Sequence, residues 1–298
     1  MITAEKGKGG CNVYYGMVTV AVILFGVQFF FTDRYQQENG TGLGATFTFS
    51  FLAAAVSALF MAAINGFRFG FTPFTLMMAT VAAVNNLLCS LCSLRALQRC
   101  NLSLYSLFSM LGGMVIPTLL GILFYQEPIT WGKLLCFVFV GAALPVSLTK
   151  SETKGGLIYC IAVFFFNGMS GALPKIFAAA QYAKATDAQY TILLQAAMLV
   201  ISGIGMLCIR KKLRRPTWKS VVFSAGGGLL NCIANFLLLI ALAVLPVSVQ
   251  YPFLTGGVII VSTVIAAFTH RKPSKKEVLA VILAFIGILL LVLVPKNI

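Results

Sequence analysis

Apolar residues run along this chain in long segments that are separated by short polar connections. Each segment is about 20 residues long, the length that a helix needs to cross the ~30 Å hydrocarbon core of a bilayer. The pattern therefore predicts ten transmembrane helices. We expect them at residues 13–32, 43–65, 73–97, 102–124, 131–148, 156–177, 190–209, 219–244, 247–268 and 277–294.

Composition supports a membrane protein. Hydrophobic residues make up 59% of the chain, charged residues make up 10%, and the mean hydropathy is +0.96. A soluble domain of 298 residues could not bury so much apolar surface. We expect an all-α integral membrane protein without an extramembrane domain, whose first apolar segment is retained because no signal-peptide cleavage pattern follows it.

The chain also repeats itself. A shift of 145 residues aligns residues 86–134 with residues 231–279 without a gap. The aligned residues include Asn86 with Asn231, Gly112 with Gly257 and Pro128 with Pro273. Ten helices then divide into halves 1–150 and 151–298. Because each half has an odd number of helices, the halves are predicted to be inverted, which is typical of secondary transporters.

The end of the first half resembles a known family. The segment "SLYSLFSMLGGMVIPTLLGILFYQEPITWGKLLCFVFVGAAL" is similar to EamA-type members of the drug/metabolite transporter superfamily, with Glu127 and Pro128 before a helix that contains Gly132 and Gly141. The resemblance implies a ten-helix carrier with a cavity between the halves and with its fifth and tenth helices at the periphery. Substrates in this superfamily include amino acids, sugars, nucleotide sugars, organic cations and drugs. The position aligned with Glu127 in the second half is Lys272, so the two halves differ there.

The acidic residues lie outside the centres of the predicted helices. All seven are at termini, in connections or at helix ends, and Gln28 is the strongly polar residue inside the first helix. Ionisable groups within a membrane are usually functional, so their absence from the predicted helix centres argues against proton-coupled export of organic cations. We expect a neutral or zwitterionic solute.

Amide side chains are the polar groups left at membrane depth. Asn86 lies near the middle of the third helix, and its repeat mate Asn231 lies in the eighth, with Asn235 four residues further on and on the same helical face. Asn167 of the sixth helix is expected at a similar depth. These amides either line a substrate cavity or hydrogen-bond the helices to one another, and we favour the cavity.

Two further residues near helix starts, Tyr105 and Gln250, are candidate mouth or gate residues. Tyr105 and Gln250 are repeat mates, and Tyr251 follows Gln250. Tyr105 fits an interfacial aromatic residue equally well. Lys175, near the end of the sixth helix, either meets a substrate carboxylate or extends to the lipid headgroups, and the second role is the commoner one.

Taken together, the predicted substrate-binding residues are Gln28, Asn86, Tyr105, Asn167, Asn231, Asn235, Gln250 and Tyr251.

Neither a metal site nor an enzyme site is visible in the sequence. Cys89 and Cys92 have C-x-x-C spacing, but no second pair and no nearby histidine completes a zinc site. We therefore predict no cofactor and no metal. The favoured function is a secondary transporter. The alternatives are an exporter of lipophilic drugs or organic cations, and a channel-like membrane protein.

The net charge of +15 comes from basic residues in the connections, where they indicate orientation and contact with anionic lipid rather than with nucleic acid. The face that carries the termini has Lys6, Lys8, Arg68, Lys133, Lys184 and Lys296. The other face has Arg34, Arg95, Arg99, Lys150, Lys154, Arg210, Lys211, Lys212, Arg214, Arg215, Lys219, Arg271, Lys272, Lys275 and Lys276. The positive-inside rule puts the termini outside the cell, whereas the resemblance puts them in the cytoplasm, so both orientations stay open.

The expected partners are a small-molecule substrate and the lipid bilayer of the plasma membrane, and the expected state is a monomer or a homodimer.

Overall fold

The computed structural model describes residues 3–40, 42–99, 102–143, 154–209, 216–268 and 275–294. Within these ranges the chain is helical and contains no strand, which confirms the predicted all-helical class. The helices are α1 (Thr3–Asn39), α2 (Leu43–Ile64), α3 (Pro73–Arg99), α4 (Leu102–Tyr125), α5 (Trp131–Ala143), α6 (Lys154–Ala179), α7 (Asp187–Cys208), α8 (Trp218–Leu242), α9 (Val247–Phe268) and α10 (Lys275–Leu293).

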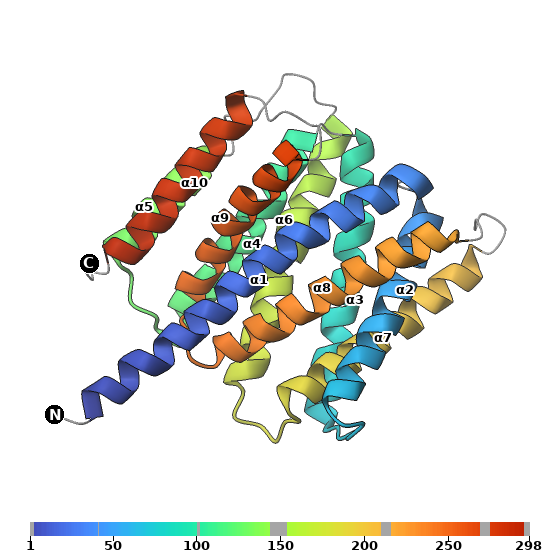
Figure 1. The fold of residues 1–298 in the computed structure, drawn as a ribbon, viewed down its shortest axis with the longest axis horizontal. Coiled ribbons are helices and arrows are strands. Elements are labelled where there is room, and N and C mark those ends of the chain that lie inside the picture. Colours follow the sequence, from blue (N-terminus) through green and yellow to red (C-terminus); the bar gives the residue numbers. More distant parts are fainter. Residues whose placement is uncertain are drawn as a thin grey trace.

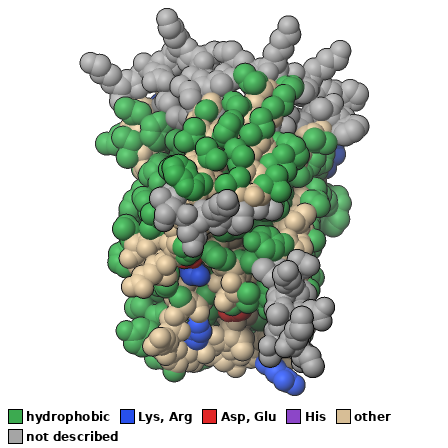
Figure 2. All heavy atoms as spheres, turned by 90° about the vertical axis from the view of Figure 1, so that its left-hand side faces the viewer, with side chains coloured by type: hydrophobic (Ala, Val, Ile, Leu, Met, Phe, Trp, Pro, Cys, Tyr) green, Lys and Arg blue, Asp and Glu red, His purple; other side chains and the backbone are tan. Residues whose placement is uncertain are grey.

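Six of the described helices, α1, α2, α3, α6, α7 and α8, are long and apolar enough to cross a membrane. Large apolar side chains are exposed on them, and such side chains cover much of the face shown in Figure 2. The two tryptophans of the chain, Trp131 and Trp218, are 50% and 79% exposed at the starts of α5 and α8. Exposed tryptophans at helix ends are typical of a membrane–water interface, which supports a membrane protein.

Helix α1 is longer than the sequence pattern predicted. The segment Asp33–Asn39, predicted as part of a polar connection, continues α1 for almost two turns. Its Arg, Gln and Glu residues have good helix propensity. Helix α1 then ends at Asn39, just before Gly40, whose positive φ of 74° suits glycine and whose N–H donates to the Gln36 carbonyl oxygen at 2.8 Å.

The helices form two groups, and each group contains helices from both halves of the chain. In the first group, α8 packs against α1 and α2, and α1 also packs against α9. In the second group, α3 packs against α6 and α7, and α6 also packs against α4. The two groups correspond to each other helix by helix. In this correspondence α1 and α2 are the counterparts of α6 and α7, and α8 and α9 are the counterparts of α3 and α4. Contacts of α2 with α7 and of α4 with α9 join the two groups.

Helices α5 and α10 pack against each other and against α9 at one edge of the bundle (Figure 1). The start of α5 meets the end of α10, where the Gly132 N–H donates to the Val294 carbonyl oxygen at 3.0 Å. The described connections 65–72, 126–130, 180–186 and 243–246 lie on the same face of the bundle as this contact and as the start of α1 (Figure 1). We call this the terminal face, and we call the opposite one the far face.

Glycines allow α4 and α6 to approach closely. A Cβ atom added to Gly112 of α4 would overlap the backbone of Phe164 in α6, and one added to Gly168 of α6 would lie 2.7 Å from the Gly112 carbonyl oxygen. Close approach at small residues is the usual way in which membrane helices associate, because lipid offers no hydrophobic driving force between them.

Candidate functional site

Two neighbouring asparagines of α3 hydrogen-bond to α6. The Asn85 Nδ2 donates to the Phe166 carbonyl oxygen at 3.0 Å and to Ser170 Oγ at 2.8 Å. Ser170 Oγ lies 2.9 Å from Asn86 Oδ1 and donates to it. Asn85 was not among the predicted site residues, and the aligned position in the second half is Leu230. The Asn85–Asn86 doublet was the signal that could have indicated it.

Asn167 of α6 faces α4 rather than α3. Its Nδ2 donates to the Ser109 carbonyl oxygen at 2.6 Å. A Cβ atom on Gly113 of α4 would lie 3.0 Å from the same Nδ2, so the amide fits against a glycine surface. The amide of Asn167 therefore fastens α4 to α6, while its Oδ1 has no hydrogen-bond partner within the described residues.

A second amide cluster joins α1 to α8. The Asn231 Nδ2 of α8 donates to Gln28 Oε1 of α1 at 3.3 Å. The Asn235 Nδ2 donates to Asn231 Oδ1 at 3.0 Å and to the Asn231 carbonyl oxygen at 2.9 Å. The Gln28 Nε2 also approaches Thr32 Oγ1 at 3.5 Å. This cluster unites three of the predicted site residues.

The two clusters occupy equivalent places in the two halves. Asn86 and Asn231 align at the 145-residue shift, and each bonds to the helix that packs beside its own, α6 for Asn86 and α1 for Asn231. The pairs α3–α6 and α8–α1 also correspond to each other, because α3 and α6 are the counterparts of α8 and α1 in the other half of the chain. No hydrogen bond links Asn86 to Asn231 in the described part of the chain, so these amides serve at least in part as the interhelical contacts that were the alternative interpretation.

Some amide atoms remain unpaired. Within the described residues, Asn86 Nδ2 and Asn235 Oδ1 have no hydrogen-bond partner. Asn235 is exposed, although Ser224, Gly228 and Leu238 on the same face of α8 are buried. Asn235 is thus an exposed amide on an otherwise largely buried face of α8. Asn86 and Asn235 therefore offer a donor and an acceptor to a polar solute.

The contacts between the groups of helices are not symmetrical. Helices α6 and α7 both contact α8. The pair that corresponds to α6 and α8 is α1 and α3, and these two helices make at most a marginal contact over their described lengths. A buried apolar cluster fills the region toward the terminal face. It contains Met78, Ala79, Ala82, Leu173, Phe177, Tyr190 and Leu239, from α3, α6, α7 and α8. This cluster, which we call the plug, separates the amides from the terminal face.

Gln250 and Tyr251 lie deep in the protein beside the plug. Gln250 is 1% exposed, and its Nε2 donates to the Leu238 carbonyl oxygen at 2.9 Å, while its Oε1 has no partner within the described residues. Tyr251 packs against Leu242 and lies close to Gly171 of α6. Both residues are thus part of the closed end of the bundle rather than of an open mouth. The side chain of Tyr105 lies outside the described residues.

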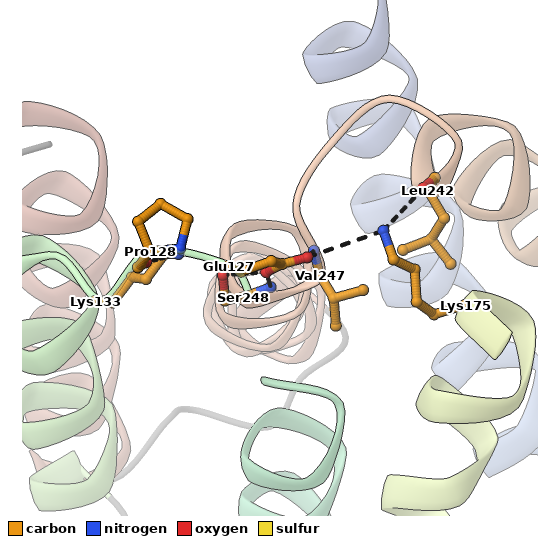
Figure 3. A network of polar contacts seen from close by, with 7 residues as sticks. All are labelled: Glu127, Pro128, Lys133, Lys175, Leu242, Val247 and Ser248. Atoms are coloured by element: carbon orange, nitrogen blue, oxygen red, sulfur yellow. Dashed lines mark hydrogen bonds and ion pairs between the residues drawn. The ribbon is translucent and has the colours of Figure 1, made fainter. Parts of the chain in front are cut away.

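A charged cluster near the terminal face was not predicted as a unit (Figure 3). Glu127 accepts hydrogen bonds from the backbone N–H groups of Val247 at 2.8 Å and Ser248 at 2.9 Å, and also from the Ser248 hydroxyl. The Lys175 Nζ lies 3.9 Å from Glu127 Oε1 and donates to the Leu242 carbonyl oxygen at 3.4 Å. Glu127 therefore binds the first N–H groups of α9, and Lys175 reaches the last carbonyl group of α8.

Lys175 does not extend to the headgroups, which corrects the role that the sequence favoured. The side chains of Lys175 and Glu127 are 14% and 9% exposed, and the Lys175 Nζ lies 5.3 Å from the centre of the Tyr125 ring. The sequence placed Lys175 near a helix end but could not show that the end of α4 and the start of α9 meet it there. On the same side, the Lys133 Nζ donates to the Pro128 carbonyl oxygen at 2.6 Å and secures the connection that carries Glu127.

A surface pocket of about 550 Å³ lies away from the amide clusters. It is lined by Glu38, Asn39, Thr217, Trp218 and Lys219, at the end of α1 and the start of α8. Asn39 is eleven residues beyond Gln28 on α1, a helical distance of about 16 Å. Among the described residues, no group of three His, Cys, Asp or Glu side chains is close enough to hold a metal ion.

The comparisons with known proteins bear on the fold. No family model matches the chain, and no curated protein matches it closely enough to be informative. A solved structure titled "Crystal structure of protein" superposes with a TM-score of 0.74 at 13% identity, covering 95% of this chain and 97% of that one. The chain is therefore similar in fold to that protein over nearly its whole length.

Proposed function

We propose that this protein is a secondary transporter that moves a small neutral or zwitterionic metabolite across a membrane by alternating access. In this proposal all ten helices span the membrane, residues 1–150 and 151–298 form an inverted repeat, and the substrate binds between the halves. The arrangement would be that of an EamA-type member of the drug/metabolite transporter superfamily.

The observation that carries the proposal is the equivalence of the two amide clusters. Asn86 and Asn231 align in the repeat and occupy corresponding helix interfaces, α3–α6 and α8–α1. Inverted repeats place such residues at similar membrane depth, where transporters bind their substrates. The unpaired Asn86 Nδ2 and the unpaired, exposed Asn235 Oδ1 match a solute that carries hydroxyl, amide or similar polar groups.

The unequal contacts of the two halves also support this proposal. A transporter with inverted halves is expected to be closed on one side while it is open on the other, because the halves adopt different conformations. Here α6 and α7 close on α8 toward the terminal face, and their counterparts α1 and α2 contact α3 less. We therefore assign the structure to a conformation that is closed at the terminal face.

The experiment has two stages. Purified protein is first screened for thermal stabilisation by amino acids, sugars and nucleosides, since a ligand at 100 times its dissociation constant adds about 2.7 kcal/mol to the free energy of unfolding. A stabilising solute is then loaded into proteoliposomes, and uptake of the same labelled solute from outside is measured. A carrier gives saturable uptake that the internal solute accelerates.

The same vesicles test the alternatives. Uptake that neither saturates nor responds to internal solute would indicate a channel and contradict the proposal. Strong uptake driven by an imposed pH gradient alone would contradict facilitated diffusion or exchange of a neutral solute. We expect no pH-driven uptake, because the carboxylate of Glu127 is already held by Val247 and Ser248 of α9.

A further inference from the structure

The turn between α8 and α9 brings two helix ends of opposite partial charge close together. Helix α8 ends at Leu242, where the last carbonyl groups carry partial negative charge, and α9 begins at Val247, where the first N–H groups carry partial positive charge. Such a turn is stabilised by a cation beside the first end and an anion beside the second.

Both charges come from elsewhere in the bundle. Glu127 follows α4 and accepts from the N–H groups of Val247 and Ser248, at 2.8 and 2.9 Å. Lys175 belongs to α6 and donates to the Leu242 carbonyl oxygen at 3.4 Å. The two charged groups lie 3.9 Å apart, between the two helix ends that they complement (Figure 3).

Each of these contacts crosses from one group of helices to the other. Glu127 and Lys175 are carried by α4 and α6 of the second group, whereas Leu242 and Val247 belong to α8 and α9 of the first. The contacts lie at the terminal face, next to the plug, and Leu242 and Val247 are themselves buried against Tyr251. The terminal face therefore cannot open between the groups while these contacts are intact.

The sequence provides this glutamate in one half of the chain. The residue that aligns with Glu127 in the second half is Lys272, which has the opposite charge. A lysine is disfavoured near the N-terminus of a helix, whereas a glutamate is favoured there. The two halves of the sequence thus differ in charge at the corresponding position.

We infer that Glu127 and Lys175 form a gate at the terminal face, which closes the central path by clamping the α8–α9 turn against α4 and α6. The inference rests on the proposed transport function, since it assigns to these residues one of the two closures that alternating access requires. Opening toward the terminal face would require Glu127 to release α9 and Lys175 to release α8. The closed state is then favoured by the charges of both residues.

The test measures access to the plug from the terminal face. Ala82 is 4% exposed within the plug, and a cysteine there changes the side chain little. In a cysteine-free background, Ala82→Cys is reconstituted into vesicles and labelled with a membrane-impermeant maleimide from the side on which Tyr182→Cys reacts. We expect Glu127→Gln and Lys175→Met each to raise the labelling rate of Ala82→Cys by about tenfold, which corresponds to about 1.4 kcal/mol.

A matched control is available at the far face. Glu38 and Lys219 form an ion pair of 3.8 Å, but both residues belong to the first group of helices, on α1 and α8. Glu38→Gln and Lys219→Met should leave the labelling of Ala82→Cys unchanged. A charge exchange, Glu127→Lys with Lys175→Glu, should also label rapidly, because each charge then faces the helix end that repels it.

Unchanged labelling in Glu127→Gln and Lys175→Met, with thermal unfolding showing that both variants are folded, would overturn the gate. Slow labelling restored by the charge exchange would also contradict it, because a simple ion pair would then explain the closure. Labelling requires no substrate, so a failure of the transport proposal would be recognised separately in the uptake measurements.

Discussion

At the scale of single residues, the amides differ in how many of their atoms are already used. Asn85 is 8% exposed, and its Nδ2 lies within hydrogen-bonding distance of two oxygen atoms on α6. Asn86, its neighbour, keeps an unpaired Nδ2 within the described residues, and Asn235 keeps an unpaired Oδ1. An amide atom that is hydrogen-bonded within the protein contributes to stability, whereas an unpaired atom can contribute to binding.

This difference predicts opposite effects of neighbouring substitutions. Asn86→Ala and Asn235→Ala should weaken the affinity for a stabilising solute by about fivefold each, since a neutral hydrogen bond is worth about 1 kcal/mol. Asn85→Ala is the matched control and should lower the free energy of unfolding by about 1 to 3 kcal/mol without changing the affinity of the folded protein. Thermal unfolding and solute titration of the three variants separate the two effects.

If Asn86→Ala and Asn235→Ala lowered stability and left the affinity unaltered, both amides would be structural. The site would then have to be sought away from α3 and α8. Asn231 is less suited to this test, because its loss would also remove the hydrogen bonds that hold Gln28 and Asn235.

At the scale of helices, the closeness of α4 and α6 depends on glycine. Gly112 and Gly168 face each other across this interface, and Asn167 adds a hydrogen bond to the Ser109 carbonyl oxygen. The short distance between the backbones brings Asn167 within reach of α4. The same interface supports Lys175, which lies two turns beyond Gly168 on α6.

We predict that Gly112→Ala destabilises the protein by about 1 to 3 kcal/mol, because the added Cβ overlaps the backbone of Phe164 rather than a movable side chain. Gly16→Ala of α1 is the control, since a Cβ there meets no atom within 4 Å. Thermal unfolding in detergent measures both variants. Equal stability of Gly112→Ala and the unsubstituted protein would show that α4 and α6 can separate without cost.

At the scale of the whole molecule, the terminal and far faces differ in structure and in charge. The terminal face is closed by the plug and by the contacts of Glu127 and Lys175. The sequence predicts more basic residues in the connections on the far face, and the positive-inside rule then predicts that this face is cytoplasmic. If this prediction holds, the proposed closed conformation is closed toward the outside of the cell.

Labelling of intact cells tests this orientation. In a cysteine-free background, Tyr182→Cys lies on the terminal face and Gln37→Cys lies near the far-face end of α1, and neither substitution changes the charge of the chain. If the basic residues determine insertion, a membrane-impermeant maleimide should modify Tyr182→Cys and spare Gln37→Cys. The reverse pattern would favour the arrangement implied by the EamA resemblance, with the termini in the cytoplasm.

The order of apolar and polar positions was enough to predict the helical class and most helix bounds. Helix α9 begins and ends at the predicted residues, Val247 and Phe268, because the length of an apolar segment and the residues that interrupt it are local properties. Helix α1 is the exception, since its polar end continues as helix until Gly40. The 145-residue shift also identified Asn86 and Asn231 as equivalent, because a repeat is visible in the order of residues alone.

Only the tertiary structure decided which atoms meet. Gln28 and Asn231 are 203 positions apart, and Glu127 binds N–H groups 120 and 121 residues away, in the other half of the chain. Helical periodicity gives the face on which a side chain lies, but not the helix that covers that face. Asn85, Lys175 and Glu127 acquired their roles when the helices packed, because burial and hydrogen bonding depend on neighbours that are distant in sequence.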